Sequence, residues 1–217
     1  MSAIQPGSSA RGDRRRTQIL DVALSHFAET GYRGASLRDI AQQVGITHPG
    51  LLYHFGSKED LLMAVLAHRD DKSYDIVGGE KSDLDAVTAL VHLVERNATQ
   101  PGLVELFVTL SAEAVDPNHP AHEYFADRYR RVVESYEVSF THLSEQGLLR
   151  AGVDPARAAR SLVAIMDGLQ VQWMYDRDAV DMAGTVLEYL RDVITDPQAV
   201  TRSFDSSRTS VVASAGQ

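Results

Sequence analysis

The sequence contains no cysteine, which excludes disulfide bonds and thiolate chemistry and fits a reducing compartment. It has no apolar run near the roughly 18 residues that a membrane-spanning helix needs. Its first residues, MSAIQPGSSARGDRRR, lack the apolar core of a signal peptide, so export is not expected. A phosphate-binding glycine loop, a Gly-x-Ser-x-Gly elbow and a His-Glu-x-x-His pair are also missing. We therefore expect a cytoplasmic protein with no membrane segment, catalytic residues, cofactor or metal.

Three neighbouring residues are the nearest approach to a metal site. His119, His122 and Glu123 lie close together, but the pattern His-Pro-Ala-His-Glu straddles a loop and a helix start. No third distant ligand accompanies them, whereas closed metal sites use a defined set of about four ligands. A surface loop is the preferred interpretation.

The sequence has fewer basic than acidic residues, with 21 Lys and Arg against 30 Asp and Glu, and its net charge is −9. This total at first argues against a nucleic-acid partner. However, residues 1–58 carry seven basic and four acidic residues (+3), whereas residues 59–217 carry fourteen and twenty-six (−12). DNA affinity depends on the local field at the contact face. The charge distribution therefore allows a DNA-binding N-terminal part on an acidic body.

Strand alternation with turn signals is missing from the whole sequence. Apolar residues recur instead at helical spacing, and 217 residues are enough to bury a core. These patterns predict an all-α fold of about nine helices. Breaks in the sequence pattern divide the chain into a disordered arm (1–13), a helix-turn-helix head with a linking helix (14–73), a helical body (80–196) and a disordered tail (197–217).

Two short helices joined by a tight turn are predicted near the N-terminus. Ser36 is suited to cap the first helix, and Gly45 is suited to end it because glycine adopts the left-handed conformation at low cost. Thr47 can cap the second helix, with Pro49 in the first turn, where a missing N–H costs nothing. This arrangement is typical of a helix-turn-helix, whose second helix, about His48 to His54, would enter a DNA major groove.

Four motifs extend this pattern over about residues 14–66. They are FAETGY (27–32), SLRDIA (36–41), VGI (44–46) and LLYHFGSKEDLL (51–62). In this order and spacing they resemble the TetR family of bacterial transcriptional regulators. The resemblance implies a homodimer with an N-terminal DNA-binding head and a C-terminal body that binds a ligand and dimerises. Members of that family usually repress, and a small molecule bound in the body releases the DNA.

The resemblance also indicates which residues contact DNA. Arg38 can bind a guanine edge through two hydrogen bonds, although an exposed arginine paired with a nearby acid is the alternative. Tyr53 and His54 match a family pair that contacts phosphates and packs the head. The family often has tyrosine at the position of Leu52, so a phosphate contact there is lost or supplied elsewhere. The predicted DNA-binding set is Ser36, Arg38, Thr47, His48, Pro49, Gly50, Tyr53, His54 and Lys58.

Two further groups of residues lie in the predicted body. Two long apolar stripes at its end exceed what a small body needs and, given the resemblance, look like half of a dimeric four-helix bundle. The predicted dimer-interface residues are Leu162, Ile165, Met166, Leu169, Met182, Val186, Tyr189 and Leu190. Aromatic and polar side chains could line an apolar cavity, although each could instead be plain core. The predicted ligand-binding residues are His92, Phe107, Tyr124, Phe125, Tyr129 and Trp173.

These features together predict a ligand-responsive transcriptional regulator, most simply a repressor. As a homodimer it would bind an inverted-repeat operator in double-stranded DNA, and a small hydrophobic or aromatic effector would release it. An activator of the same fold is one alternative. A small α-helical enzyme would need a polar catalytic cluster in the body. A DNA-independent interaction module would lose its phosphate-facing side chains, yet Arg38, Tyr53 and Lys58 are present.

Overall fold

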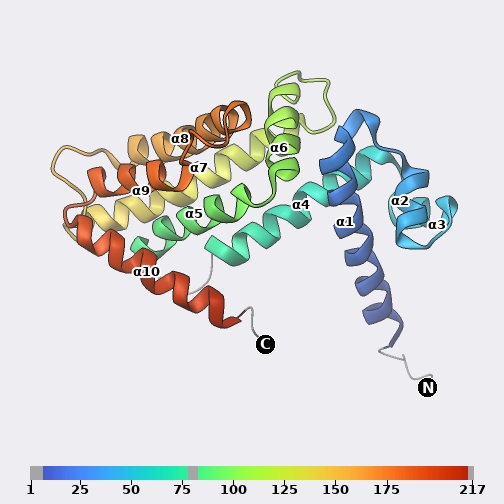
Figure 1. The fold of residues 1–217 in the computed structure, drawn as a ribbon, viewed down its shortest axis with the longest axis horizontal. Helices are drawn as coiled ribbons and strands as arrows, with labels where there is room; N and C mark the ends of the chain where they lie inside the picture. The colour runs from blue at the N-terminus through green and yellow to red at the C-terminus, as the bar shows by residue number, and fades with distance from the viewer. Residues whose placement is uncertain (1–6, 78–82, 215–217) are drawn as a thin grey trace.

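The computed structural model describes residues 7–77 and 83–214, and within them it is all-α (Figure 1). The predicted fold class is confirmed, with ten helices where about nine were expected. They are α1 (Gly7–Gly34), α2 (Leu37–Val44), α3 (His48–His54), α4 (Lys58–Val77), α5 (Asp83–Ala98), α6 (Pro101–Glu113), α7 (His122–Glu145), α8 (Pro155–Tyr175), α9 (Met182–Val193) and α10 (Pro197–Ser214). Among the described residues, no helix is long and apolar enough to cross a membrane.

The short helices of the head begin and end as the sequence predicts. The Ser36 hydroxyl accepts a hydrogen bond from the Asp39 N–H, and the Thr47 hydroxyl accepts one from Gly50. Gly45 ends α2 with a φ of 76°, a left-handed conformation that suits glycine. Packing then supports these helices, which are too short to be stable alone. Their buried anchors, together with those of α1, are Ile19, Leu20, Phe27, Ile40, Leu51 and Phe55.

Helix α4 joins the head to the body. Its first half contributes Leu61, Leu62, Val65 and Leu66 to the core of the head, all of them completely buried. Its second half continues toward α5 and α7 (Figure 1). Because one helix takes part in both halves of the molecule, a displacement at one end of α4 is transmitted to the other.

Helix α6 makes a second connection between the head and the body. Gly102, in its first turn, lies so close to α1 that a Cβ atom there would be 2.8 Å from the Ala28 carbonyl oxygen. A glycine is therefore required for this approach. Farther along α6, Leu106, Phe107 and Leu110 belong to the same hydrophobic cluster as the head.

The body packs around a separate hydrophobic cluster. Helix α5 contributes five buried residues to this core, and residues of α7, α8 and α9 complete it (Figure 1). Its fully buried members include Val87, Phe140, Leu162, Val186 and Leu190.

The predicted disordered tail is wrong, because residues 197–214 form α10. Val200 and Ser203 are buried, and the Ser203 hydroxyl lies 2.7 Å from the Thr88 hydroxyl of α5. The Phe204 ring stacks on His92 with centroids 4.5 Å apart. The Ser- and Thr-rich composition suggested disorder, but the four-residue spacing of Val200 and Phe204 is that of a helix face.

The N-terminal boundary also differs from the prediction. Helix α1 starts at Gly7, within the segment 1–13 that we expected to be disordered, and residues 1–6 lie outside the described residues. Gly31, within α1, is a non-helical residue with a φ of 70°, after which the chain makes one more turn to Gly34.

Replacing Gly102 with alanine should lower the free energy of unfolding by about 1–3 kcal/mol, because the new methyl group collides with the Ala28 backbone. Chemical denaturation would measure the change. Gly12→Ala is the matched control, since a Cβ at Gly12 meets nothing within 4 Å. Equal stability of the two variants would contradict the proposed tightness of the α1–α6 contact.

Candidate nucleic-acid interface and ligand cavity

Helix α3 presents its polar residues at the outer end of the molecule (Figure 1). Leu51 is fully buried and anchors the helix, whereas Thr47 and Pro49 are exposed and Tyr53 is 89% exposed. His48, Gly50 and His54 are half-buried, and the rings of Tyr53 and His54 meet edge to face. An exposed phenol hydroxyl and an accessible helix start can both donate hydrogen bonds to a nucleic acid.

Arg38 on α2 is exposed and makes no ion pair with any residue that the structure describes. The alternative of an arginine held by a nearby acid is therefore not what this structure shows. Ser36 is half-buried and occupied in capping α2.

Lys58 is engaged within the head. Its Nζ donates a hydrogen bond to the Arg33 carbonyl at 3.2 Å and lies 4.8 Å from the centre of the Tyr32 ring. Two arginines of α1 also pack locally, because Arg16 lies over the Phe55 ring and Arg15 bonds to Gln18. These contacts brace the head.

Residues of α4, α5, α6, α7 and α8 line a partly open cavity of about 150 Å³. Its walls are partly apolar, from Leu93, Phe107, Phe125 and Met166. Its polar lining is unusually rich in charge for the interior of a protein. The polar lining residues are Arg69, Asn97, Ser111, Arg128, Tyr129, Asp167 and Gln170.

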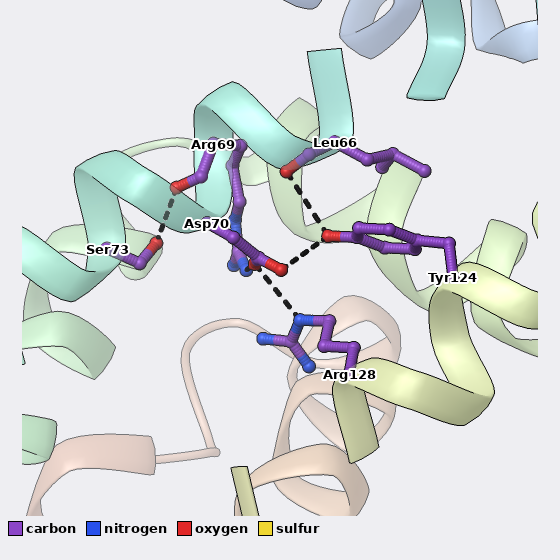
Figure 2. Close-up of polar contacts among 6 residues, drawn as sticks. All are labelled: Leu66, Arg69, Asp70, Ser73, Tyr124 and Arg128. Carbon is purple, nitrogen blue, oxygen red and sulfur yellow. Dashed lines mark hydrogen bonds and ion pairs between the residues drawn. The ribbon is translucent and has the colours of Figure 1, made fainter. Parts of the chain in front are cut away.

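Asp70 of α4 is the centre of a polar cluster beside this cavity. Tyr124 and Arg128 of α7 both donate to its carboxylate, at 2.5 Å from the Tyr124 hydroxyl and 3.0 Å from the Arg128 Nε (Figure 2). The Tyr124 hydroxyl also lies 3.2 Å from the Leu66 carbonyl. Burial and the neighbouring Asp70 raise the pKa of Tyr124, so this phenol remains a donor. The cluster joins α4 to α7.

Arg69 is the second cation at the cavity. Only 6% of the residue is exposed, and its guanidinium lies over the Phe107 ring at 3.9 Å. Its Nη1 reaches Asp70 at 3.4 Å, but its buried Nε has no hydrogen-bond partner among the described residues. Burial, and then the nearby Arg128, lower the pKa of Arg69 to about 10, which reflects the cost of a poorly compensated buried charge.

Asp167 of α8 also lines the cavity. Burial raises the pKa of this carboxyl, whereas the neighbouring Tyr129, Arg128 and Arg69 act to lower it. Burial and Asp167 in turn raise the pKa of Tyr129 to about 12. Both residues also line an open groove between α7 and α8, so this pair separates the cavity from the surface.

The structure brings together three of the six predicted ligand-binding residues. Phe107, Phe125 and Tyr129 line the cavity, and Tyr124 lies next to it in the Asp70 cluster. His92 and Trp173 are placed elsewhere. The His92 ring stacks on Phe204 of α10 and bonds to its carbonyl, whereas Trp173 lies in the body core with Arg177 over its ring.

Sequence reasoning missed the charged residues of the cavity, although their spacing contained a signal. Arg69 follows Val65 and Leu66 on the buried face of α4, and Arg128 follows Phe125 by three residues. A charged residue in register with a buried stripe is more often functional than an exposed one.

Most of the predicted dimer-interface residues face the interior of their own protomer. Leu162, Met166, Leu169, Met182, Val186 and Leu190 are all buried, which corrects the prediction. Ile165 and Tyr189 are half-buried, and the Tyr189 hydroxyl donates to the Ala158 carbonyl. Periodicity identifies an apolar face but does not say whether the body itself covers it.

The surface of α8 carries a different stripe. Ala164, Val171 and Tyr175 are exposed and Gly168 is half-buried, at a spacing that places all four on one face. Tyr175 is 89% exposed and Val171 43%. A Cβ atom at Gly168 would meet nothing within 4 Å.

The candidate metal residues have other partners. His122 Nδ1 lies 2.8 Å from the Ala114 carbonyl, and His119 Nδ1 accepts a hydrogen bond from the Ala121 N–H. Within the part of the chain that the structure describes, no group of three potential ligands is arranged to hold a metal ion.

Two family models match the two halves of this molecule. The first, described as bacterial regulatory proteins of the tetR family, matches residues 19–65, which contain the helix-turn-helix. The second, the C-terminal domain of BetI-type transcriptional repressors, matches residues 85–196, more than half of the chain. The chain belongs to the TetR family. This TetR-family protein is thus a transcriptional regulator, and the family is not one of enzymes.

Individual relatives agree with this assignment. The transcriptional repressor KstR2 of Rhodococcus jostii (strain RHA1) is 33% identical over 148 residues, 64% of this chain and 65% of KstR2. A TetR-family regulator from Rhodococcus sp. superposes with a TM-score of 0.71 at 23% identity, over 84% of this chain and 100% of its own. A transcriptional regulator from Saccharomonospora viridis, in complex with choline, gives 0.69 at 22%, over 85% and 100%. The Rhodococcus and Saccharomonospora structures therefore share the fold of this chain.

Removing the Asp70 carboxylate should destabilise this TetR-family protein by about 3 kcal/mol, because Asp70→Ala leaves Arg128 largely buried without its partner. Denaturant titration would measure the loss. Asp127→Ala is the control, since its pairs with Arg130 and Arg131 are exposed and should contribute less than about 1 kcal/mol. Similar losses in both variants would show that the Asp70 cluster does not stabilise the α4–α7 contact.

Proposed function

We propose that this protein is a cytoplasmic, ligand-responsive repressor that binds an inverted-repeat operator as a homodimer. The observation that supports DNA binding most directly is the exposed α3, capped by Thr47 and projecting Tyr53 at the end of the molecule farthest from α9. In such units the start of the second helix reads base edges while flanking residues bind phosphates. The excess of basic residues in 1–58 favours this contact electrostatically.

We assign the DNA contacts by chemistry. Arg38 and His48 are the side chains best suited to base edges, because Gly50 offers no side chain and Leu52 no hydrogen bond. Tyr53, His54 and Lys58 bind phosphates, with Lys58 leaving its Arg33 carbonyl to do so. Ser36, Thr47 and Pro49 hold the helix starts whose free N–H groups attract phosphate.

The homodimer places two copies of α3 on adjacent half-sites, about one DNA turn or somewhat more apart. The α8 stripe of Ala164, Gly168, Val171 and Tyr175 supports this assembly, because small residues let two helices approach closely while Val171 and Tyr175 supply apolar area. Ile165 and Leu187, both half-buried, extend that surface.

Regulation follows from the cavity between α4 and α8. An effector bound there favours a body shape in which α4 moves the heads out of register, provided that it binds this shape more tightly than the DNA-bound one. The choline complex of the Saccharomonospora relative supports a small-molecule effector in this family of bodies. A repressor is favoured over an activator because the matched C-terminal model is that of a repressor.

Single substitutions in α2 to α4 should separate phosphate binding from base reading. Tyr53→Phe and Lys58→Ala should weaken binding to operator and scrambled DNA alike, by roughly fivefold each, because each removes one phosphate contact. Arg38→Ala should relax specificity at one base position, at a cost of about 1–3 kcal/mol on the operator only. Electrophoretic mobility shifts would measure both; losses confined to the operator for all three variants would contradict the assignment.

A bulky residue at position 168 should separate the protomers. Gly168→Trp projects an indole into space that is open in one protomer and closed in the dimer, whereas Gly168→Ala should leave the dimer intact. Sedimentation velocity at micromolar concentration would report the assembly, and circular dichroism would confirm folding. A monomeric wild-type protein, or a dimeric Gly168→Trp variant, would refute an interface centred on this stripe.

A further inference from the structure

The cavity holds two guanidinium groups whose situations differ. Arg128 donates its Nε to Asp70 at 3.0 Å, and Tyr124 binds the other oxygen of the same carboxylate at 2.5 Å. Asp70 is therefore well satisfied by α7 alone (Figure 2). Arg69 reaches the same carboxylate only at 3.4 Å, the outer limit of a hydrogen bond.

Arg69 consequently keeps unused hydrogen-bonding capacity inside the protein. It is only 6% exposed, and its Nε has no partner among the described residues. Leaving a buried donor of a charged group unsatisfied is costly, and native structures rarely do so without a reason. The guanidinium lines the cavity directly.

Asp167 lines the same cavity but forms no ion pair with Arg69 among the described residues, so the two charges interact only at longer range. The remaining polar lining residues, such as Asn97, Ser111 and Gln170, are neutral. Arg69 is therefore the lining cation with the weaker contact to an anion, since it reaches Asp70 at 3.4 Å and Arg128 does so at 3.0 Å.

The volume and the apolar lining of the cavity indicate what the rest of the ligand must be like. A cavity of about 150 Å³ is comparable to one that holds a single benzene ring. Phe107, Phe125 and Met166 supply apolar walls, and Phe107 lies directly under the Arg69 guanidinium. An anionic group at Arg69 would thus sit at the edge of an apolar compartment.

We propose that the effector is a small organic anion, a one-ring or similarly compact carboxylate whose anionic group binds Arg69. This proposal rests on the proposed function as a ligand-responsive regulator. The carboxylate of the effector takes the unused Arg69 donors, and its apolar part fills the space against Phe107 and Met166. The anion competes with Asp70 for the Arg69 guanidinium and so draws Arg69 away from it. Both residues belong to α4. The effector thereby acts on the helix that enters the head.

The test compares three ligands that share one ring and differ in charge. Benzoate is anionic, benzamide neutral and benzylammonium cationic, and isothermal titration calorimetry on the wild-type protein without DNA measures each affinity. We expect benzoate to bind at least tenfold more tightly than benzamide and benzylammonium to bind most weakly, since hydrogen bonds to charged partners are the stronger ones. Equal affinities, preference for the cation or binding of none of the three would overturn the proposal.

A variant pair identifies the cation responsible. Arg69→Met retains the side-chain length over Phe107 and removes the charge, so the benzoate affinity should fall at least tenfold and the benzamide affinity should change less than twofold. Arg177→Met is the matched control, because Arg177 also lies over an aromatic ring but outside the cavity, and it should bind benzoate like the wild type. Unchanged benzoate binding by a folded Arg69→Met protein would overturn the assignment; if that variant does not fold, the wild-type ligand series still decides.

These experiments distinguish failure of the anion proposal from failure of the proposed repressor function. Operator binding without ligand tests the repressor, whereas the benzoate series needs no DNA. An operator-binding protein that ignores benzoate keeps its function and loses only this ligand class.

Discussion

The hydrogen bonds from Tyr124 and Arg128 to Asp70 hold α4 against α7 where α4 leaves the head. Four to eight residues earlier, Leu62, Val65 and Leu66 of the same helix are fully buried in the head. A helix fixed in this way cannot slide at one end alone, because both packed interfaces resist partial displacement. The position of α3 relative to the body therefore depends on whether Asp70 keeps its partners.

This polar cluster is a poor device for stability alone. Burying charges costs desolvation energy, and apolar residues of similar volume are often as stabilising as a buried ion pair. The desolvation cost is poorly compensated at Arg69, since it is buried beside Arg128 with only a weak contact to Asp70. A pair of buried arginines beside the Phe107 ring is better explained by a ligand that completes the hydrogen bonding of Arg69 than by packing alone.

The sequence was most informative where local chemistry decides the structure. Ser36, Gly45 and Thr47 cap or end helices as expected, because a cap depends on residues within three or four positions. It was least informative where tertiary contacts decide. The burial of Leu162 and Val186, the docking of Phe204 on His92 and the position of Arg69 depend on segments distant in the chain, which periodicity does not identify.

Helix α6 gives the cavity a second connection to the head. Phe107 forms a wall of the cavity and also belongs to the hydrophobic cluster of the head, while Gly102, five residues earlier, touches Ala28 of α1. A ligand that shifts Arg69 must also disturb the Phe107 ring stacked beneath it. Because α4 and α6 both line this cavity and both pack against α1, their combined displacement would move the head as a unit, which is how rigid helices convert a small local shift into a larger domain movement.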